Sequence, residues 1–513
     1  MKKYIIAFAA LTALFSSFSC EDALDESPET FFSEEQIYST EQGVESVING
    51  LYQSMADPGY HGSSMHGLIM PISGKFFSNQ GASEDATSLN CSPVNTWITR
   101  LWPQMYTTVN IANGIILNLE NTDVALENRE TALAQAYFIR AVTYFDLVRW
   151  FGEVPLRLEP STNETLHVAR APKSEVYAQI ISDFEKAAAT LPDFGEYLEG
   201  RPVKYAANAY LAKVYMQMAG EDNGNPAFWQ NAKNEALKVI GRYSLNATYA
   251  EIFDLSNENS EESIFELQYG QNGALRNSDV IRFYTPRNSV FTPDNTVTFG
   301  RIRPNKETFD QHVNQYPEDP RIEGTFVFGS YEQNNGSERT IYPERTSGND
   351  GYAVIRKYFD PNFNGTTTNR NFIKFRYADL LLMLAEIENE LNGPANAYQY
   401  VNEVLARART TEEGEVTEPQ DFAGMDQDEF RTRILRERQY ELLAEGHIWF
   451  DTRRRGYQYF LDEVVTPHNT HPTFDENTDF VYPVSVKNML LPIPSNEISG
   501  NQAITPADQN PGY

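Results

Sequence analysis

A regular spacing of apolar residues marks one segment in the first third of the chain, at Ala134, Tyr137, Phe138, Ala141, Tyr144, Phe145 and Val148. Steps of three and four residues place these side chains on one wide face of an α-helix, and Gly152 and Pro155 predict where that helix ends. Aromatic rings interspersed with alanines are typical of packing between helices. We therefore interpret this face as core and not as a ligand-binding surface.

The same period predicts further helices over residues 33–56, from 96 onward, and over 174–191, 204–218, 232–240, 375–391 and 428–453. Gly393 and Pro394 end one of these helices and open another, which reaches Arg409. Pairs of helices with alanine and tyrosine at their contacts resemble tetratricopeptide units, although the strict repeat consensus is not met. The sequence thus predicts a mainly α fold, a tetratricopeptide-like helical-repeat scaffold over about residues 33–56, 96–250 and 372–460.

Other parts of the chain lack the helical period. Glycine, asparagine, proline and threonine are frequent between about residues 251 and 371, together with the short β-type runs SIFELQY, TVTFG, TFVFGS and YAVIRKY. These features predict a loop-rich, partly β insertion. Residues 60–95, rich in glycine, serine and asparagine, predict a loop region, and residues 461–513 predict an extended C-terminal segment.

Residues 1–19 are typical of a signal peptide, with two lysines, a short apolar run and small residues before Cys20. A signal that ends at cysteine resembles that of a bacterial lipoprotein, although Ser17 and Phe18 depart from the usual residues. Acylation of Cys20, with palmitate for example, would leave Cys91 without a disulfide partner. The alternative is ordinary cleavage nearby. Residues 20–32 form an acidic tether, which is either a surface-display signal or a solvated linker.

The charge and the motifs exclude several classes of function. A formal net charge of −30 argues against nucleic acid as a partner. The chain has no HExxH or GxSxG motif and no phosphate-binding glycine loop. Acidic pairs such as Glu261 and Glu262 are too common to single out a glycosidase site, and His468 with His471 is a weak metal signal. We predict a binding protein rather than an enzyme, with no cofactor and no metal.

Four stretches, in this order, resemble landmarks of the SusD/RagB family: YFIRAVTYFDLVRWFGEVPL, KFRYADLLLMLAEIENELNG, RILRERQYELLAEGHIWFDTRRRG and LLPIPSNEISGNQAITPADQNPGY. The resemblance covers essentially the whole chain after the signal and implies a SusD-like domain over residues 33–513. It also implies a lipoprotein on the face of the outer membrane that captures nutrient ligands, most often glycans. As partner it implies a SusC-like TonB-dependent transporter, over which the protein acts as a lid.

Sugar binding requires exposed aromatic rings on loops, with polar groups that reach the hydroxyls. Trp97 lies where a loop meets a helix and is the first candidate, although Trp102 on the same helix makes core packing an equal alternative. The resemblance places ligand contacts in the N-terminal loop and in the central insertion. This adds four candidate rings and two polar partners: Tyr60, Tyr284, Phe291, Tyr331, Asn95 and Asp85. A peptide-capturing member of the family and a secreted glycoside hydrolase remain alternatives.

The charged residues of the third landmark have helical spacings for ion pairs, namely Arg436, Glu437, Arg438, Glu441 and Glu445. With Asp451 and the arginines at 453–455 they predict a buried structural network that ties this helix to its neighbours. The alternative is an anion site. Trp150 and Trp449 are predicted to be core or interdomain packing, and the end of the chain is predicted to tuck against the body.

Overall fold

The computed structural model describes residues 33–195, 200–222, 224–270, 278–294, 296–363, 365, 368 and 370–513. The predicted signal peptide, Cys20 and the acidic tether lie outside these ranges. Cys91 is buried and free.

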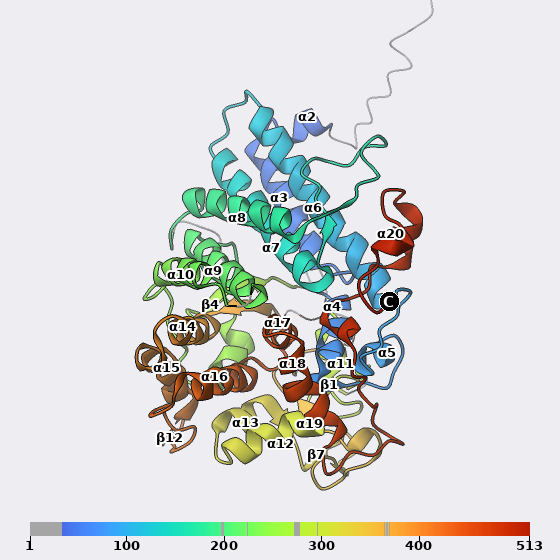
Figure 1. Ribbon diagram of the computed structural model, residues 1–513, viewed down its shortest axis with the longest axis vertical. Helices are drawn as coiled ribbons and strands as arrows, with labels where there is room; N and C mark the ends of the chain where they lie inside the picture. Colours follow the sequence, from blue (N-terminus) through green and yellow to red (C-terminus); the bar gives the residue numbers. More distant parts are fainter. Residues whose placement is uncertain are drawn as a thin grey trace, which may run out of the picture.

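Helices that follow one another in the chain pack side by side, as Figure 1 shows from blue to green. They are α6 (Thr96–Asn121), α7 (Arg129–Phe151), α8 (Lys173–Thr190), α9 (Lys204–Glu221) and α10 (Pro226–Leu237). A second group packs on α10, formed by α14 (Tyr377–Asn392), α15 (Tyr398–Arg409) and α16 (Gln427–Leu442). The predicted mainly α, tetratricopeptide-like fold is confirmed.

Helix α7 is the centre of the first group. Every residue from Ala132 to Phe151 is buried, so the helix is enclosed all round and not only along its predicted face. The Trp150 ring stacks on Phe450 at 6.0 Å between centroids, and Trp449 is 1% exposed. The interpretation of these aromatic residues as core is confirmed.

Two predicted helices are each divided in the structure. Residues 33–56 form α2 (Glu34–Ile37), which Ser33 caps, and α3 (Glu41–Met55). The predicted helix at 428–453 becomes α16 and α17 (Ile448–Arg454), with left-handed backbone at Ala444 and Gly446 between them. A side chain at Gly446 would place its Cβ 2.6 Å from Met65, so the chain turns there where only glycine fits.

The predicted loop at residues 60–95 is mostly buried and is interrupted by short helices. It contains α4 (Ser64–Met70), a π-helical turn η2 (Pro71–Lys75), β1 (Phe76–Phe77) and α5 (Ser83–Thr87). Its small residues permit close packing and do not signal a loop. A Cβ on Gly67, for example, would lie 2.5 Å from the Trp97 ring.

Within the described ranges the strands form six two-stranded antiparallel pairs. They are β1 with β5 (Arg303–Pro304), β2 (Val154–Pro155) with β3 (Arg170–Ala171), β4 (Ser263–Leu267) with β10 (Phe372–Arg376), β6 (Phe326–Val327) with β9 (Val354–Ile355), β7 (Ser330–Glu332) with β8 (Glu338–Thr340), and β11 (Thr410–Thr411) with β12 (Gly414–Glu415). The predicted run TVTFG, residues 296–300, forms no strand. Three short helices in the insertion were not predicted: α11 (Val280–Tyr284), α12 (Lys306–Gln315) and α13 (Pro320–Thr325).

The C-terminal segment is irregular and contains short helical turns, which are α18 (Tyr457–Phe460), η7 (Leu461–Val465), α19 (Thr466–Asn469), η8 (Val486–Met489), α20 (Ser495–Gly500) and η9 (Pro506–Asp508). Its last residues lie against the end of α7. The Asn510 side chain donates to the carbonyls of Phe151 and Leu491, at 2.8 and 2.7 Å. The predicted tucking of the chain end is confirmed.

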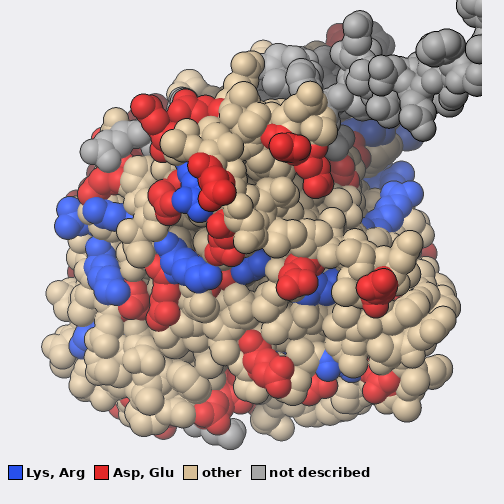
Figure 2. Space-filling view, turned by 90° about the horizontal axis from the view of Figure 1, so that it is seen from above, with Lys and Arg blue, Asp and Glu red and all other residues tan. Residues whose placement is uncertain are grey.

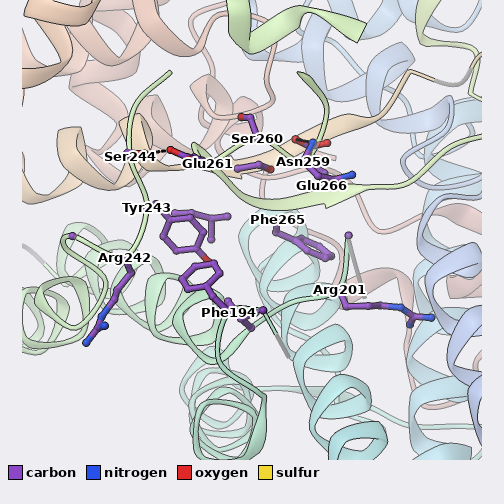
Figure 3. A pocket seen from close by; sticks show the side chains of 16 residues that line it. Phe194, Arg201, Arg242, Tyr243, Ser244, Asn259, Ser260, Glu261, Phe265 and Glu266 are labelled. Carbon is purple, nitrogen blue, oxygen red and sulfur yellow. Dashed lines mark hydrogen bonds between the residues drawn. The ribbon is translucent and has the colours of Figure 1, made fainter. Parts of the chain in front are cut away.

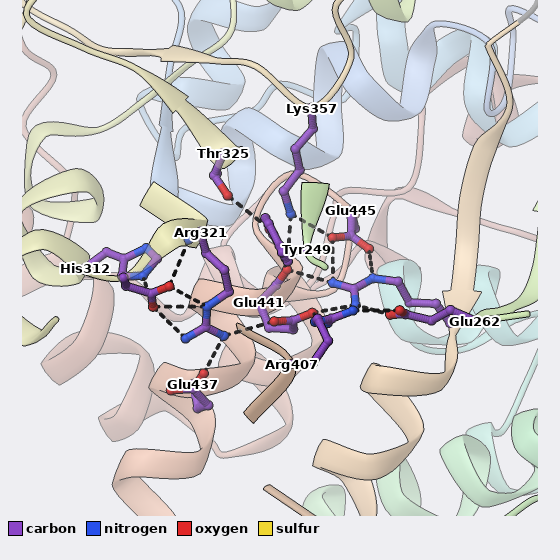
Figure 4. A network of polar contacts seen from close by, with 12 residues as sticks. Tyr249, Glu262, His312, Arg321, Thr325, Lys357, Arg407, Glu437, Glu441 and Glu445 are labelled. Carbon is purple, nitrogen blue, oxygen red and sulfur yellow. Dashed lines mark hydrogen bonds and ion pairs between the residues drawn. The ribbon is translucent and has the colours of Figure 1, made fainter. Parts of the chain in front are cut away.

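A buried ion network joins α16 to the insertion and to β10 (Figure 4). Glu441 accepts from Arg321 at 2.9 Å, from Arg376 at 2.6 Å, and from Arg407. Glu445 accepts from Arg376 at 2.7 Å and from Lys357 at 2.8 Å. The structural role of these acids is therefore confirmed, but their partners lie on other elements and not one turn away on α16.

We predict that Glu441→Gln lowers the free energy of unfolding by about 3–5 kcal/mol, because buried guanidinium groups lose their counter-charge. Burial opposes ionisation of Glu441, but Arg407, Arg376 and Arg321 still hold its pKa well below the usual range. The stabilisation is therefore complete above the pKa of the unfolded chain, near 4.3, and is lost as pH falls.

Thermal melts between pH 7 and pH 3 measure this effect. Acid should destabilise the variant less than the wild type. Glu429→Gln on the exposed face of the same helix is the matched control and should melt like the wild type. Equal melting of all three proteins would contradict the assignment.

Candidate functional site

The predicted ring Trp97 packs inward and is only partly exposed. Its Nε1 donates to Ser83 Oγ at 3.2 Å, the ring lies close to Gly67, and Phe283 is 5.9 Å away edge-on. Arg100 lies 5.9 Å from the ring centroid. These contacts make Trp97 a packing residue at the start of α6.

Asn95 and Asp85, the two predicted polar partners of the sugar, form hydrogen bonds within the protein instead. Asn95 is the N-cap of α6, and its Oδ1 accepts from the amides of Trp97 and Ile98. Its Nδ2 donates to the carbonyl of Ala82 and to Asp85. Both side chains therefore order the turn that leads into the helix.

Tyr60 and Tyr284 are both 0% exposed, which contradicts the expectation that their rings face a ligand. The Tyr60 hydroxyl donates to Asp146 at 2.7 Å, and Asp146 also binds Arg149 and Lys374. The Tyr284 hydroxyl lies 3.3 Å from His66 Nδ1. Both tyrosines lie in segments taken for loops that are instead buried helix or turn.

Phe291 and Tyr331 lie together in a small core of their own. Their centroids are 5.9 Å apart, and Phe291 stacks on Phe359 at 4.3 Å. Ile341, Val354 and Val327 belong to the same cluster, which we call the satellite core. Tyr331, although 6% exposed, reaches from it to the edge of a pocket.

That pocket has a volume of about 400 Å³, and arginine is its most frequent side chain. We call it the arginine pocket; it is lined by Gln80, Arg287, Asn288, Phe299, Arg301, Arg303, Tyr331, Gln333, Arg339, Asn349 and Asp350. β7, which contributes Tyr331, lies at the lower end of Figure 1, whereas the described chain begins at α2 at the upper end. The pocket therefore lies at the opposite end of the molecule from the first described helix.

A second pocket of about 530 Å³ lies between the helices and β4 (Figure 3), and we call it the aromatic pocket. Phe194 is 45% exposed there and meets Tyr243 edge-on at 5.0 Å. Two of its charged groups have partners within the protein: Glu261 accepts from Ser244 at 2.8 Å, and Arg201 binds Glu45 at 2.8 Å. Arg242 is exposed there and lies 4.9 Å from the centroid of the Tyr205 ring.

The weak catalytic and metal candidates have structural roles. Glu262 is buried and accepts from Arg376 and Arg407 at 2.8 and 2.7 Å. His468 lies between Glu307 and the carbonyl of Phe480, and His471 contacts Asp310. Among the described residues, no group of three or more His, Cys, Asp or Glu is placed to hold a metal ion.

Two further features concern the surface and the membrane. The upper end of the molecule, seen in Figure 2, carries acidic and basic side chains interspersed on a mostly uncharged surface. In the part of the chain that the structure describes, no helix combines the length and apolar character needed to cross a bilayer.

Comparison with known proteins assigns the family. The SusD family model matches residues 207–513, and a model described as starch-binding associating with outer membrane matches residues 22–216. The chain is 30% identical to SusD-like protein P2 of Formosa agariphila, over 100% of both chains. It belongs to the SusD family, which confirms the resemblance found in the landmarks.

Solved structures share the fold. A SusD homologue from Bacteroides thetaiotaomicron has a TM-score of 0.80 at 19% identity, with 94% of this chain and 99% of that chain covered. A laminarin-binding SusD-like protein has a TM-score of 0.70 at 22% identity, with 93% and 100% covered.

The arginines of the pocket were missed in the sequence, although a signal exists. Residues 282–303 contain four arginines and one acidic residue, in a chain whose net charge is −30. A basic segment in an acidic chain indicates a surface region whose charge is opposite to that of the rest of the protein.

We predict that Trp97→Ala lowers the free energy of unfolding by about 3 kcal/mol, because the ring fills the space above Gly67. Gly67→Ala should destabilise similarly, since its Cβ would collide with the same ring. Both variants should retain ligand binding. If Trp97→Ala melts like the wild type but no longer binds glycan, the result would contradict the packing role and support the indole as a ligand contact.

Proposed function

We propose that the chain is a non-catalytic, cell-surface lipoprotein that captures a glycan in the arginine pocket and delivers it to a SusC-like TonB-dependent transporter, acting as its lid. Membership of the SusD family and the similarity to a laminarin-binding protein support capture of a glycan. The partnership with the transporter rests on the family resemblance.

The choice of this pocket is supported by two arginines that lack an ion-pair partner among the described residues. Within the described ranges, Arg287 and Arg301 contact no carboxylate at ion-pair distance, and both line a pocket with the exposed side chains of Gln80 and Asn288. Exposed amide and guanidinium groups are the donors that sugar hydroxyls require. The aromatic pocket offers an exposed ring and one exposed arginine, Arg242.

Glycan capture can be tested by native affinity electrophoresis against a panel of polysaccharides, with the reaction mixture assayed for new reducing ends. We expect at least one polysaccharide to retard the protein, with no product formed, because the acidic pair Glu261 and Glu262 is engaged in internal contacts. Formation of product would favour the hydrolase alternative. Retardation by none, with binding of peptides instead, would favour the peptide-capturing alternative.

The lipid anchor is proposed from residues 1–32. Cys20 would carry the acyl chains, and residues 20–32 would be the tether that holds the folded domain away from the membrane. Two or three acyl chains anchor a protein stably, at about 0.8 kcal/mol per buried methylene.

We predict that the full chain incorporates labelled palmitate in a Bacteroides host and that Cys20→Ser abolishes both the label and membrane association. Cys91→Ser is the matched control and should keep both, since Cys91 is buried. Label that persists in the Cys20 variant would contradict the anchor.

A further inference from the structure

The arginine pocket contains more positive than negative charge. Four arginines line it, Arg287, Arg301, Arg303 and Arg339, against the single carboxylate of Asp350. Asp350 is already shared, because it accepts from Arg339 at 2.7 Å and lies 3.1 Å from Arg345 outside the lining. The one acid present therefore cannot neutralise the arginines around it.

The remaining arginines form no direct ion pair in the described part of the chain, although Asp350 lies near enough to Arg303 to attract its charge. Arg303 is 8% exposed and donates to the carbonyls of Gly300 and Asn349, which are neutral acceptors. Arg301 Nε is buried and has no hydrogen-bond acceptor among the described residues. Arg287 is exposed and has no ion-pair partner there. Buried or clustered charge of this kind is ordinarily paired, so an external counter-charge is the missing element.

The cluster is held together against its own repulsion. The guanidinium groups of Arg282 and Arg301 lie 4.4 and 4.1 Å from the centroid of the Phe299 ring, which attracts both. Burial, and then the charges of Arg282 and Arg287, lower the pKa of Arg301. Arg282 also pairs with Asp279 at 3.3 Å, whereas Arg301 and Arg287 have no such partner among the described residues. An anion bound beside Arg301 and Arg287 would relieve the repulsion between them.

We propose that the arginine pocket binds an anionic group of the glycan, a uronate carboxylate or a sulfate ester. The guanidinium fork matches the planar pair of oxygens of a carboxylate and the oxygens of a sulfate. The exposed side chains of Gln80 and Asn288 are then left for the neighbouring hydroxyls. The inference rests on the proposed function and adds the chemical class of its ligand.

The net charge of the chain makes this pocket selective. At −30, the whole protein repels polyanions at long range, so an acidic polysaccharide gains nothing from the general surface. Binding must come from the few short-range contacts in the pocket. It should therefore disappear when those contacts are removed.

The test is affinity electrophoresis and calorimetry with matched pairs of polymers: polygalacturonate with its methyl ester, carrageenan with its desulfated form, and laminarin as a neutral glucan. We expect the wild type to bind at least one anionic polymer. Its affinity for the neutralised partner of that polymer should be at least tenfold lower. The polymer that binds distinguishes carboxylate from sulfate. Hydrogen bonds to charged groups contribute about 1.5–3 kcal/mol, which is roughly a tenfold or greater change in affinity.

Three variants complete the test. Arg287→Gln and Arg301→Gln should each weaken anionic binding about tenfold, and Arg287 is exposed, so its variant should fold normally. Arg242→Gln removes the same charge from the aromatic pocket and should bind like the wild type. Thermal melts of all three proteins exclude misfolding as the cause.

The outcomes separate the two proposals. Binding of neutral and anionic polymers with equal affinity, or anionic binding unchanged in Arg287→Gln and Arg301→Gln, would overturn the inference and leave glycan capture standing. Failure of every polymer to bind would overturn the proposed function and the inference with it.

Discussion

Glu441 is the point on which the two halves of the molecule depend. Its carboxylate forms ion pairs with the buried guanidinium groups of Arg321 in α13, Arg376 in β10 and Arg407 in α15. These elements come from the insertion and from the second helical group. A buried charge without partners is strongly destabilising. Displacing any one of these segments would leave buried charges on the others unpaired, so the segments stabilise one another.

The same network supports the lobe that contains the arginine pocket. Arg321 in α13 is followed by β6, which pairs with β9, and Val354 of β9 belongs to the satellite core with Tyr331. Lys357, just beyond β9, binds Glu445 of the network. The irregular lobe that carries the arginine pocket is thus connected to the helical half by packed and charged contacts. Rigid support of this kind holds binding side chains in position.

The sequence predicts the helical half well and the candidate site poorly, for physical reasons. Helical period identifies α7 because its apolar and aromatic residues recur over six turns, and the landmarks identify the family. Residues 60–95 were mistaken for a loop because glycine and serine serve there in close packing, as at Gly67. Tyr60 and Tyr284 were mistaken for exposed rings because their burial depends on Asp146 and His66, which are distant in the chain. The arginine pocket is assembled from four separate segments, and no local pattern reports which of its charges lack a partner.

The most direct test of glycan capture in the arginine pocket is a crystal structure of the protein with a bound acidic oligosaccharide, such as tetragalacturonate. We expect carboxylate oxygens of the ligand about 2.7–2.9 Å from guanidinium nitrogens of Arg287 and Arg301. An oligosaccharide seated in the aromatic pocket against Phe194, or beside Trp97, with the arginine pocket empty, would contradict it.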